Sequence, residues 1–288
     1  MIPSLNIIAW GNRVPWADQR QVEQDLVISR AIVAIFSDPL LHSELRFRGG
    51  TALNKLHFAM PLRYSEDIDL VRTTAGPIGP IIDRVRVVME PWMGRGQFDQ
   101  SPIAPKLRFR ADAEGSQANS PIRLKVEINT REIVAHDAPI TIAFRVENPW
   151  FSGAVDVPTF SREEMLATKV RALLQRDKGR DLFDLAHGLD EFVGLDTARL
   201  VECFAIYLAQ SGATLSRAQA QERMFAKLAN PRFLTDIGPL LPAAQANLLT
   251  DASTKIAFQK VFTRIINLIA GDHWVRTDEM KKRFEIDF

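Results

Sequence analysis

The sequence has only one cysteine, Cys203, among 288 residues. A lone cysteine excludes an intrachain disulfide, and its apolar neighbours predict a buried thiol. No run approaches the roughly 20 apolar residues that cross a bilayer. The N-terminus also lacks the basic start and long apolar core of a secretory signal. Together these absences predict a cytoplasmic protein with no membrane partner.

Charge of one sign is not in excess either. Lys and Arg number 36 against 35 Asp and Glu, and the two signs nearly balance within residues 1–160 and within 161–288. The chain therefore has no basic tail of the kind that indicates a nucleic-acid binder. Any contact with nucleic acid must use a local patch. The five histidines show no zinc-ligand spacing, and the Gly-Lys-Ser/Thr phosphate loop is absent.

Hydrophobic periodicity predicts an α+β chain with a mixed sheet first and helices afterwards. We place the boundary near residue 160, which gives one domain over 1–160 and a helical one over 161–288. The helical part has breaks near Gly194, Gly212, Asn230 and Pro242. In the first domain we expect helices at 18–36, 51–58 and 81–89, a polar turn at 114–120, irregular chain at 94–105, and strands at 45–48, 65–71, 106–111, 122–130, 138–146 and 155–157.

Two aspartates, Asp67 and Asp69, lie one residue apart within an apolar strand pattern. The period of two places both carboxylates on one face, with Ile68 and Leu70 on the other. Such close carboxylates repel each other unless a cation lies between them. Because oxygen-only anionic ligands suit Mg²⁺, or Mn²⁺, the pair predicts a metal site. The Ser65 hydroxyl beside it could touch the metal or a phosphate, or serve only as a cap or turn hydroxyl. The alternative is a pair of solvated carboxylates.

Two other features extend this prediction. Glu127 lies on the polar face of a strand whose other face is apolar, so it is the candidate third carboxylate; the alternative is a surface pair with Lys125. Gly49, Gly50 and Thr51 fall at a strand-to-helix junction, where free backbone amides favour anions. They predict a phosphate-binding turn, unless they form only a tight turn.

A basic cluster follows the predicted domain boundary. Five of the residues from 169 to 180 are basic and one is acidic. If one helix runs through this segment, Lys169, Arg176, Arg180 and Asp184 fall within roughly a quarter-turn of one another; Gly179 could instead divide it into two helices. We expect the basic row to hold triphosphate, whereas the alternative is a solvated helix face.

Three segments together resemble the AbiEii/AbiGii family of nucleotidyltransferase toxins, which includes the MenT-type toxins. They are 47–53 (FRGGTAL), 63–70 (RYSEDIDL) and 169–184, and the likeness extends over residues 20–270. The resemblance implies the polymerase-beta-like nucleotidyltransferase fold and a helical region after it. By motif position, it implies a nucleotide-binding turn at Gly49, Gly50 and Thr51, a metal motif at Ser65, Asp67 and Asp69, a basic active-site residue at Lys169 and an acidic one at Asp184. Glu127 resembles the third carboxylate of the wider superfamily.

The resemblance also implies an activity and partners. We expect a nucleoside triphosphate as donor, Mg²⁺ or Mn²⁺ as cofactor, an RNA acceptor at the tRNA 3′ end, and a separate antitoxin protein. Asp67, Asp69 and Glu127 would serve the metal and the acceptor hydroxyl, while Lys169, Arg176 and Arg180 would offset phosphate charge. Two alternatives stay open: transfer to a protein or small-molecule hydroxyl, and a catalytically silent module that binds RNA or a partner. The balanced charge gives no independent sign of RNA binding.

Overall fold

The computed structural model describes residues 2–114, 121–242, 246–247 and 249–287 and divides the chain into two compact units, Met1–Ser161 and Arg162–Phe288. The first contains α1 (Ser4–Gly11), α2 (Gln19–Phe36), α3 (Pro39–Glu44), β1 (Leu45–Arg48), α4 (Gly49–Ala52), η1 (Leu53–His57), β2 (Asp67–Arg72), α5 (Gly79–Met93), β3 (Gln97–Asp99), β4 (Lys106–Ala111), β5 (Ile122–Asn129), β6 (Ile140–Asn148) and β7 (Phe151–Thr159).

A mixed seven-stranded sheet organises the first unit, in the order β3-β4-β5-β2-β1-β7-β6. β2 runs parallel to β5, and β1 runs parallel to β7, while the other neighbours are antiparallel. In the parallel pair, Asp67 lies opposite Lys125 and Asp69 lies opposite Glu127. The register therefore brings the aspartate pair and the candidate third carboxylate onto adjacent central strands.

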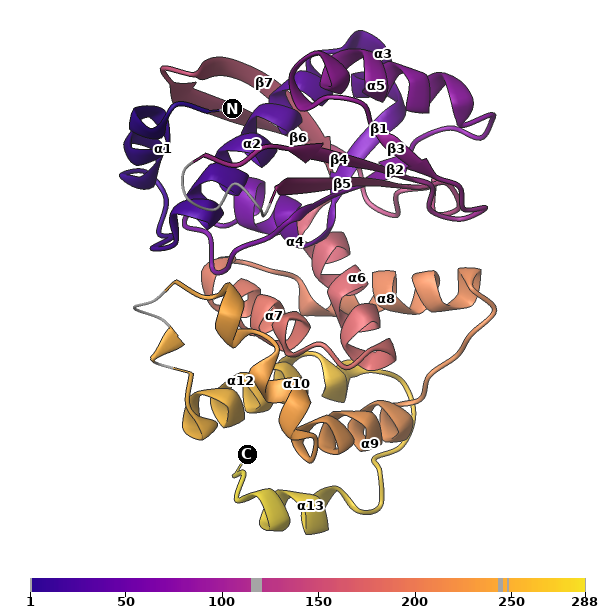
Figure 1. Ribbon diagram of the computed structural model, residues 1–288. Coiled ribbons are helices and arrows are strands. Elements are labelled where there is room, and N and C mark those ends of the chain that lie inside the picture. The colour runs from indigo at the N-terminus through magenta and orange to yellow at the C-terminus, as the bar shows by residue number, and fades with distance from the viewer. Residues whose placement is uncertain (1, 115–120, 243–245, 248, 288) are drawn as a thin grey trace. The chain divides into compact units, whose positions relative to one another are not determined.

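One face of this sheet is apolar and is covered by helices. α2, α3 and α5 lie on the same side of the sheet, and α2 contacts β2, β5, β6 and β7 (Figure 1). Ile68, Leu70, Phe109, Leu124 and Val126 are fully or almost fully buried. Because side chains alternate along a strand, the charged residues between them point to the opposite face.

Most of the predicted elements of the first unit are present. The strands at 45–48 and 106–111 have the predicted bounds, and Asp18 caps α2 through the amide of Arg20. α5 is longer than predicted, and β3 lies within the segment predicted to be irregular. The sequence also missed α1 and α3, which are too short to show a full apolar period. Most of the turn predicted at 114–120 lies outside the described residues.

The second unit is helical throughout its described part, which confirms the α+β class with a helical C-terminal region. Its core contains an aromatic cluster in which the ring of Phe225 lies 5.3 Å from Phe258, 5.4 Å from Phe262 and 6.1 Å from Trp274. The elements are α6 (Arg162–Gln175), α7 (Gly179–Glu191), α8 (Thr197–Gln210), α9 (Arg217–Leu228), α10 (Pro231–Thr235), η3 (Gly238–Leu240), α12 (Asp251–Arg264), η4 (Ile266–Leu268) and α13 (Thr277–Phe284).

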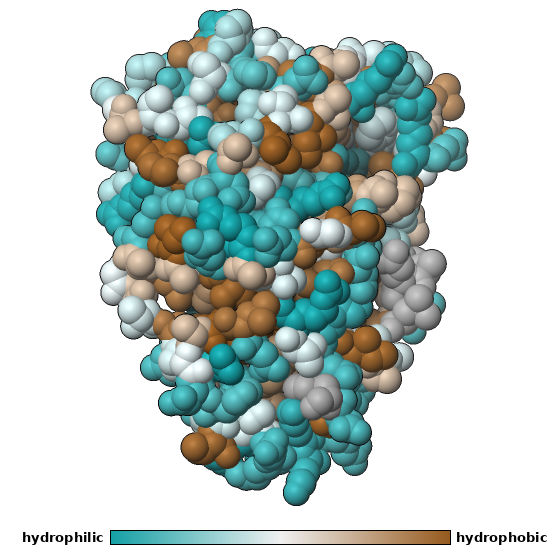
Figure 2. Space-filling view, turned by 180° about the vertical axis from the view of Figure 1, so that it is seen from behind, coloured by the Kyte–Doolittle hydropathy of each residue, from teal (hydrophilic) through white to brown (hydrophobic). Residues whose placement is uncertain are grey.

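On the face seen in Figure 2, hydrophobic patches are separated by hydrophilic side chains. Within the described residues, every helix is too short or too polar to span a bilayer.

Candidate active site

Asp67 and Asp69 project from the same face of β2, as the alternation predicts. Asp67 is 44% exposed at its side chain, and Asp69 is partly buried, whereas Ile68 between them is fully buried. The strand thus presents two carboxylates on a partly open surface with an apolar anchor behind them. This is the arrangement in which a cation can lower the repulsion between the two charges.

The register places two charged rows side by side on this face. One row crosses the sheet through Arg48, Asp69, Glu127 and Lys106, and the other passes from Asp67 to Lys125 on β5. In the first row the two carboxylates of Asp69 and Glu127 lie opposite each other with a cation on either side, and in the second Asp67 lies opposite a cation, which favours their pairing.

Lys125 occupies the space between Asp67 and Glu127. Its ammonium nitrogen lies 2.9 Å from Asp67 Oδ2 and 3.2 Å from Glu127 Oε2, and Lys106 Nζ lies 3.6 Å from the same Glu127 oxygen. Burial lowers the pKa of Lys125, but Asp67 and Glu127 outweigh burial and hold this pKa above its usual value. Lys125 is therefore charged at neutral pH and neutralises part of the acidic cluster.

The positions of these carboxylates and lysines determine whether the site can hold a divalent ion. Across the parts of the chain that the structure describes, no group of three or more His, Cys, Asp or Glu side chains is gathered as a metal site. Two strand carboxylates on one face suit Mg²⁺, which takes one or two carboxylates and keeps further positions for water and phosphate. Asp67 and Asp69 fit that requirement. The candidate third carboxylate, Glu127, lies opposite Asp69 on β5, and its Oε2 contacts Lys106 and Lys125.

The glycine pair is required by close contacts. Gly49 has a φ of +86°, and a Cβ built on it would lie 2.3 Å from Asp69 Oδ2. A Cβ on Gly50 would lie 2.2 Å from a guanidinium nitrogen of Arg63. Any larger residue at either position would therefore displace the carboxylate or the guanidinium. The predicted turn lies directly beside the second aspartate, and Arg63, to which sequence reasoning assigned no role, lies against the turn.

Thr51 and Ser65 connect the turn to the start of β2. Thr51 is buried, its hydroxyl lies 2.7 Å from the Ser65 hydroxyl, and it also donates to the backbone carbonyl of Asp67. Both hydroxyls therefore have partners within the fold. Their arrangement fixes the backbone of Asp67 relative to α4.

In the second unit, Lys169 lies in a buried ionic cluster. Its ammonium is 2.8 Å from Asp184 Oδ2 and 3.2 Å from Asp181 Oδ1, while Arg176 binds both Asp181 oxygens at 2.8 and 2.9 Å. Both aspartates are fully buried. Burial raises the pKa of Asp181, but Lys169 and Arg176 outweigh it and hold this pKa below its ordinary value. The sequence predicted Lys169 and Asp184 here but missed Asp181, which lies three residues before Asp184 on the same helical face.

Of the two possibilities for the basic cluster, the structure has two helices rather than one. α6 ends at Gln175 and α7 begins at Gly179, so Gly179 separates two helices. Arg176 lies between the helices and folds back onto Asp181. Arg180, in the first turn of α7, forms no ion pair with any residue that the structure describes. Lys169, Arg176 and Arg180 therefore do not form one helical row.

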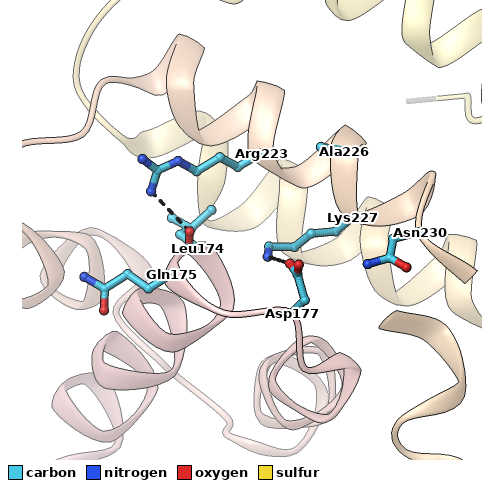
Figure 3. Close-up of a pocket in the computed structure, with 7 residues that line it drawn as sticks. All are labelled: Leu174, Gln175, Asp177, Arg223, Ala226, Lys227 and Asn230. Carbon is cyan, nitrogen blue, oxygen red and sulfur yellow. Dashed lines mark hydrogen bonds and ion pairs between the residues drawn. The ribbon is translucent and has the colours of Figure 1, made fainter. Parts of the chain in front are cut away.

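Cations of α9 hold the junction between α6 and α7. Arg223 donates to the Leu174 carbonyl at 3.2 Å, and Lys227 donates to the Arg176 carbonyl at 2.9 Å and to Asp177 at 2.6 Å. These side chains line a pocket of about 430 Å³, in which Arg223 points to Leu174 and Lys227 to Asp177 (Figure 3). Cations at helix carbonyl ends are stabilising. The pocket is therefore explained by helix capping that positions Arg176.

Comparisons with known proteins agree with the fold. Two solved structures are similar in fold. MenT4, a nucleotidyltransferase toxin of Mycobacterium tuberculosis, is 17% identical with a TM-score of 0.64 and covers 99% of each chain. JHP933 of Helicobacter pylori is 18% identical with a TM-score of 0.51 and covers 93% of this chain and 96% of that one.

No curated protein matches the sequence. Residues 30–264, most of the chain, match the sequence model of the family described as nucleotidyl transferase AbiEii toxin, type IV toxin–antitoxin system. Nucleotidyltransferases of this kind generally use a nucleoside triphosphate and a divalent metal. The chain belongs to the AbiEii family of nucleotidyltransferase toxins of type IV toxin–antitoxin systems.

Proposed function

We propose that this nucleotidyltransferase is Mg²⁺-dependent and transfers nucleotides from a nucleoside triphosphate to the 3′ end of tRNA. The observation that supports this proposal best is the position of Asp67 and Asp69, on one face of β2 and directly against the Gly49 turn. Carboxylates beside an open backbone turn suit a triphosphate that carries a divalent ion. The type IV system implies an antitoxin as a further partner.

The two aspartates would hold the metal, which would stabilise charge on the phosphates. Glu127 is the proposed third carboxylate, either for a second metal position or for the acceptor hydroxyl. Lys125 lies between Glu127 and Asp67, and an ammonium at this position can also pair with phosphate oxygens. This position favours a site in which Lys125 exchanges its contacts with the carboxylates for contacts with a bound ligand.

The turn beside Asp69 would receive the triphosphate. Gly49 and Gly50 let the Asp69 carboxylate and the Arg63 guanidinium lie directly against the backbone of the turn. Thr51 and Ser65, which bond to each other, would act by fixing the Asp67 backbone rather than by binding phosphate.

The second unit would contribute positive charge. We assign this role to Lys169 and Arg176, whose positions Asp181 and Asp184 determine, and to Arg180, which has no carboxylate partner in the described chain. Cations that the fold already holds in position stabilise the negative charge that develops in phosphoryl transfer.

The test is incubation of the protein with each labelled nucleoside triphosphate, Mg²⁺ and total tRNA. We expect label in the tRNA band, and we expect Asp67→Asn and Asp69→Asn to lose at least about 1000-fold of the rate, since metal and charge stabilisation provide several kcal/mol. Asp83→Asn, which changes an exposed carboxylate of α5, is the matched control and should keep the wild-type rate. Folded protein that labels tRNA with none of the four triphosphates would contradict the tRNA proposal.

The ion pairs of Lys125 favour one second candidate, a catalytically silent module that binds RNA or a partner. In such a module, lysine rather than a metal would neutralise the acidic cluster permanently. This candidate predicts that Asp67→Ala leaves the cellular phenotype intact, whereas the enzyme predicts its loss. A labelled protein band in place of labelled tRNA would instead favour transfer to a protein hydroxyl.

A further inference from the structure

The polar face of β4 and β5 carries a concentration of cations. Arg108 and Arg110 on β4 alternate with the buried Leu107 and Phe109, and Arg123 and Lys125 alternate with buried residues on β5. Arg110 and Arg123 are exposed. We define these four residues, Arg108, Arg110, Arg123 and Lys125, as the arginine face.

The strand register makes this face costly for the fold. Arg108 lies directly opposite Lys125, and Arg110 lies directly opposite Arg123. Like charges directly opposite on neighbouring strands destabilise a sheet. Asp99 lies 3.3 Å from Arg108, and Asp67 and Glu127 pair with Lys125.

No such compensation is present at Arg110 and Arg123, which form no ion pair with any residue in the described ranges. Protection of a sheet edge does not explain the pair, because β5 lies between β4 and β2. An uncompensated cross-strand arginine pair therefore indicates an anionic ligand.

The surface around this pair is hollowed. A depression of about 480 Å³ is lined by all four residues of the arginine face together with Glu66 and Asp67. It therefore connects Arg110 and Arg123 with one of the two proposed metal ligands. An anion bound to the arginines would therefore lie in the same depression as Asp67.

The phosphate that the arginines would bind could belong to the triphosphate or to the acceptor, and the order of the residue rows along the strands distinguishes the two. Gly49 contacts Asp69, so the proposed triphosphate turn lies at the row of Asp69 and Glu127. Arg110 and Arg123 lie two rows away, beyond Asp67. In phosphoryl transfer the attacking and leaving oxygens lie roughly in line, so the acceptor enters from the side opposite the leaving diphosphate. A triphosphate whose diphosphate leaves toward the Gly49 turn would therefore receive its acceptor from the side of Arg110 and Arg123.

From these observations we propose that the arginine face binds the phosphodiester backbone of the RNA acceptor and leads its 3′ end to Asp67. The inference rests on the proposed function for the identity of the acceptor. Arginine forks bind phosphate oxygens in pairs. Phe98, the exposed aromatic on neighbouring β3, faces Arg86 of α5 rather than this face. Recognition would therefore use phosphates and would be largely independent of sequence.

The test measures equilibrium binding of the full chain to labelled total tRNA, without triphosphate or metal, beside binding of a non-hydrolysable triphosphate analogue with Mg²⁺. We expect Arg110→Ala/Arg123→Ala to weaken tRNA binding at least tenfold and to change analogue binding less than twofold. Arg110→Lys/Arg123→Lys should restore most of the tRNA affinity. The matched control Arg13→Ala/Arg145→Ala removes two exposed arginines that both pair with Glu147, and it should bind tRNA like wild type.

Three results would overturn the inference: tRNA affinity of the alanine double variant within twofold of wild type, an equal loss in the control, or a loss confined to the triphosphate analogue. Both arginines are exposed, so an unchanged melting temperature would show that the fold is intact. Failure of the proposed function gives a different pattern. In that case wild-type protein transfers no label to tRNA, although tRNA binding still depends on Arg110 and Arg123.

Discussion

At the scale of single residues, the candidate site depends on two glycines, which have no side chain, as much as on its charged side chains. Gly49 and Gly50 leave space for an Asp69 oxygen and an Arg63 nitrogen that any Cβ would displace. In the second unit, the buried Asp181 joins Lys169 to Arg176. In the first case the absence of a Cβ, and in the second a single carboxylate, determines where the neighbouring charged side chains lie.

Gly49→Ala should therefore be more harmful than an ordinary glycine substitution. The φ of +86° and the contact with Asp69 predict a loss of about 1–3 kcal/mol in the free energy of unfolding, measured by urea denaturation. Gly79→Ala, where a Cβ meets nothing within 4 Å, is the control and should stay within about 1 kcal/mol of wild type. Equal stability of the two variants would disprove the steric explanation.

Asp181 predicts a pH dependence. Its pKa is held below the usual 3.8 in the folded chain, so its carboxylate stabilises the fold above about pH 4, and that contribution is lost as the pH falls through the folded pKa. Asp181→Asn should cost roughly 3–5 kcal/mol at pH 7, because it leaves Lys169 and Arg176 poorly compensated, and the difference should shrink below pH 4. Urea midpoints at several pH values measure this. Asp190→Asn, an exposed partner of Lys260, should show neither effect.

At the scale of elements, a buried ionic group holds three segments of the first unit together. Asp25 of α2 accepts the indole N–H groups of Trp10 in α1 at 2.8 Å and of Trp16 at 2.9 Å, and Lys55 of η1 lies 2.7 Å from both its oxygens. Because η1 continues the helix that begins at the glycine pair, this network also supports the turn of the candidate site.

Asp25→Asn should lower the free energy of unfolding by about 3 kcal/mol or more, since Lys55 would remain buried without its carboxylate. Adding Lys55→Met should recover part of this loss, because the uncompensated charge is then removed. Tryptophan fluorescence during urea unfolding reports both effects, since the two indoles contact Asp25 directly. Additive losses in the double variant would show that the pair is not coupled.

At the scale of the whole molecule, the net charge is +1, so overall attraction to RNA is small. RNA binding through the arginine face should involve few phosphates and show a modest salt dependence. Removing Arg110 and Arg123 should make the slope of log affinity against log salt shallower by about 1–1.5, as two fewer contacts with a single strand imply. Titrations at several salt concentrations measure this slope, and an unchanged slope would mean that neither arginine contacts phosphate.

Most of the central strands could be predicted because alternating and apolar segments are local properties of the sequence. Asp67 and Asp69 share a face for that reason, and the strand at 106–111 has its predicted bounds. The pair of Lys125 with Glu127 lies within one strand and was one of the two predicted readings of Glu127. The pairing of Lys125 with Asp67 could not be predicted, since it depends on which strands become neighbours and in which register. The division at Gly179 was one of two predicted possibilities, and only the folded chain distinguished them.

The sequence by itself determined the family, the succession of sheet and helices, and the face on which the acidic pair lies, because motif spacing and side-chain alternation follow from the order of residues. The tertiary structure alone decided the partners of those charges. Lys125 meets Asp67 of the neighbouring strand, Arg63 fills the space above Gly50, Asp181 joins Lys169, and Arg110 faces Arg123. Each of these contacts joins residues on different elements, or elements separated by a turn, so strand register and helix packing bring them together.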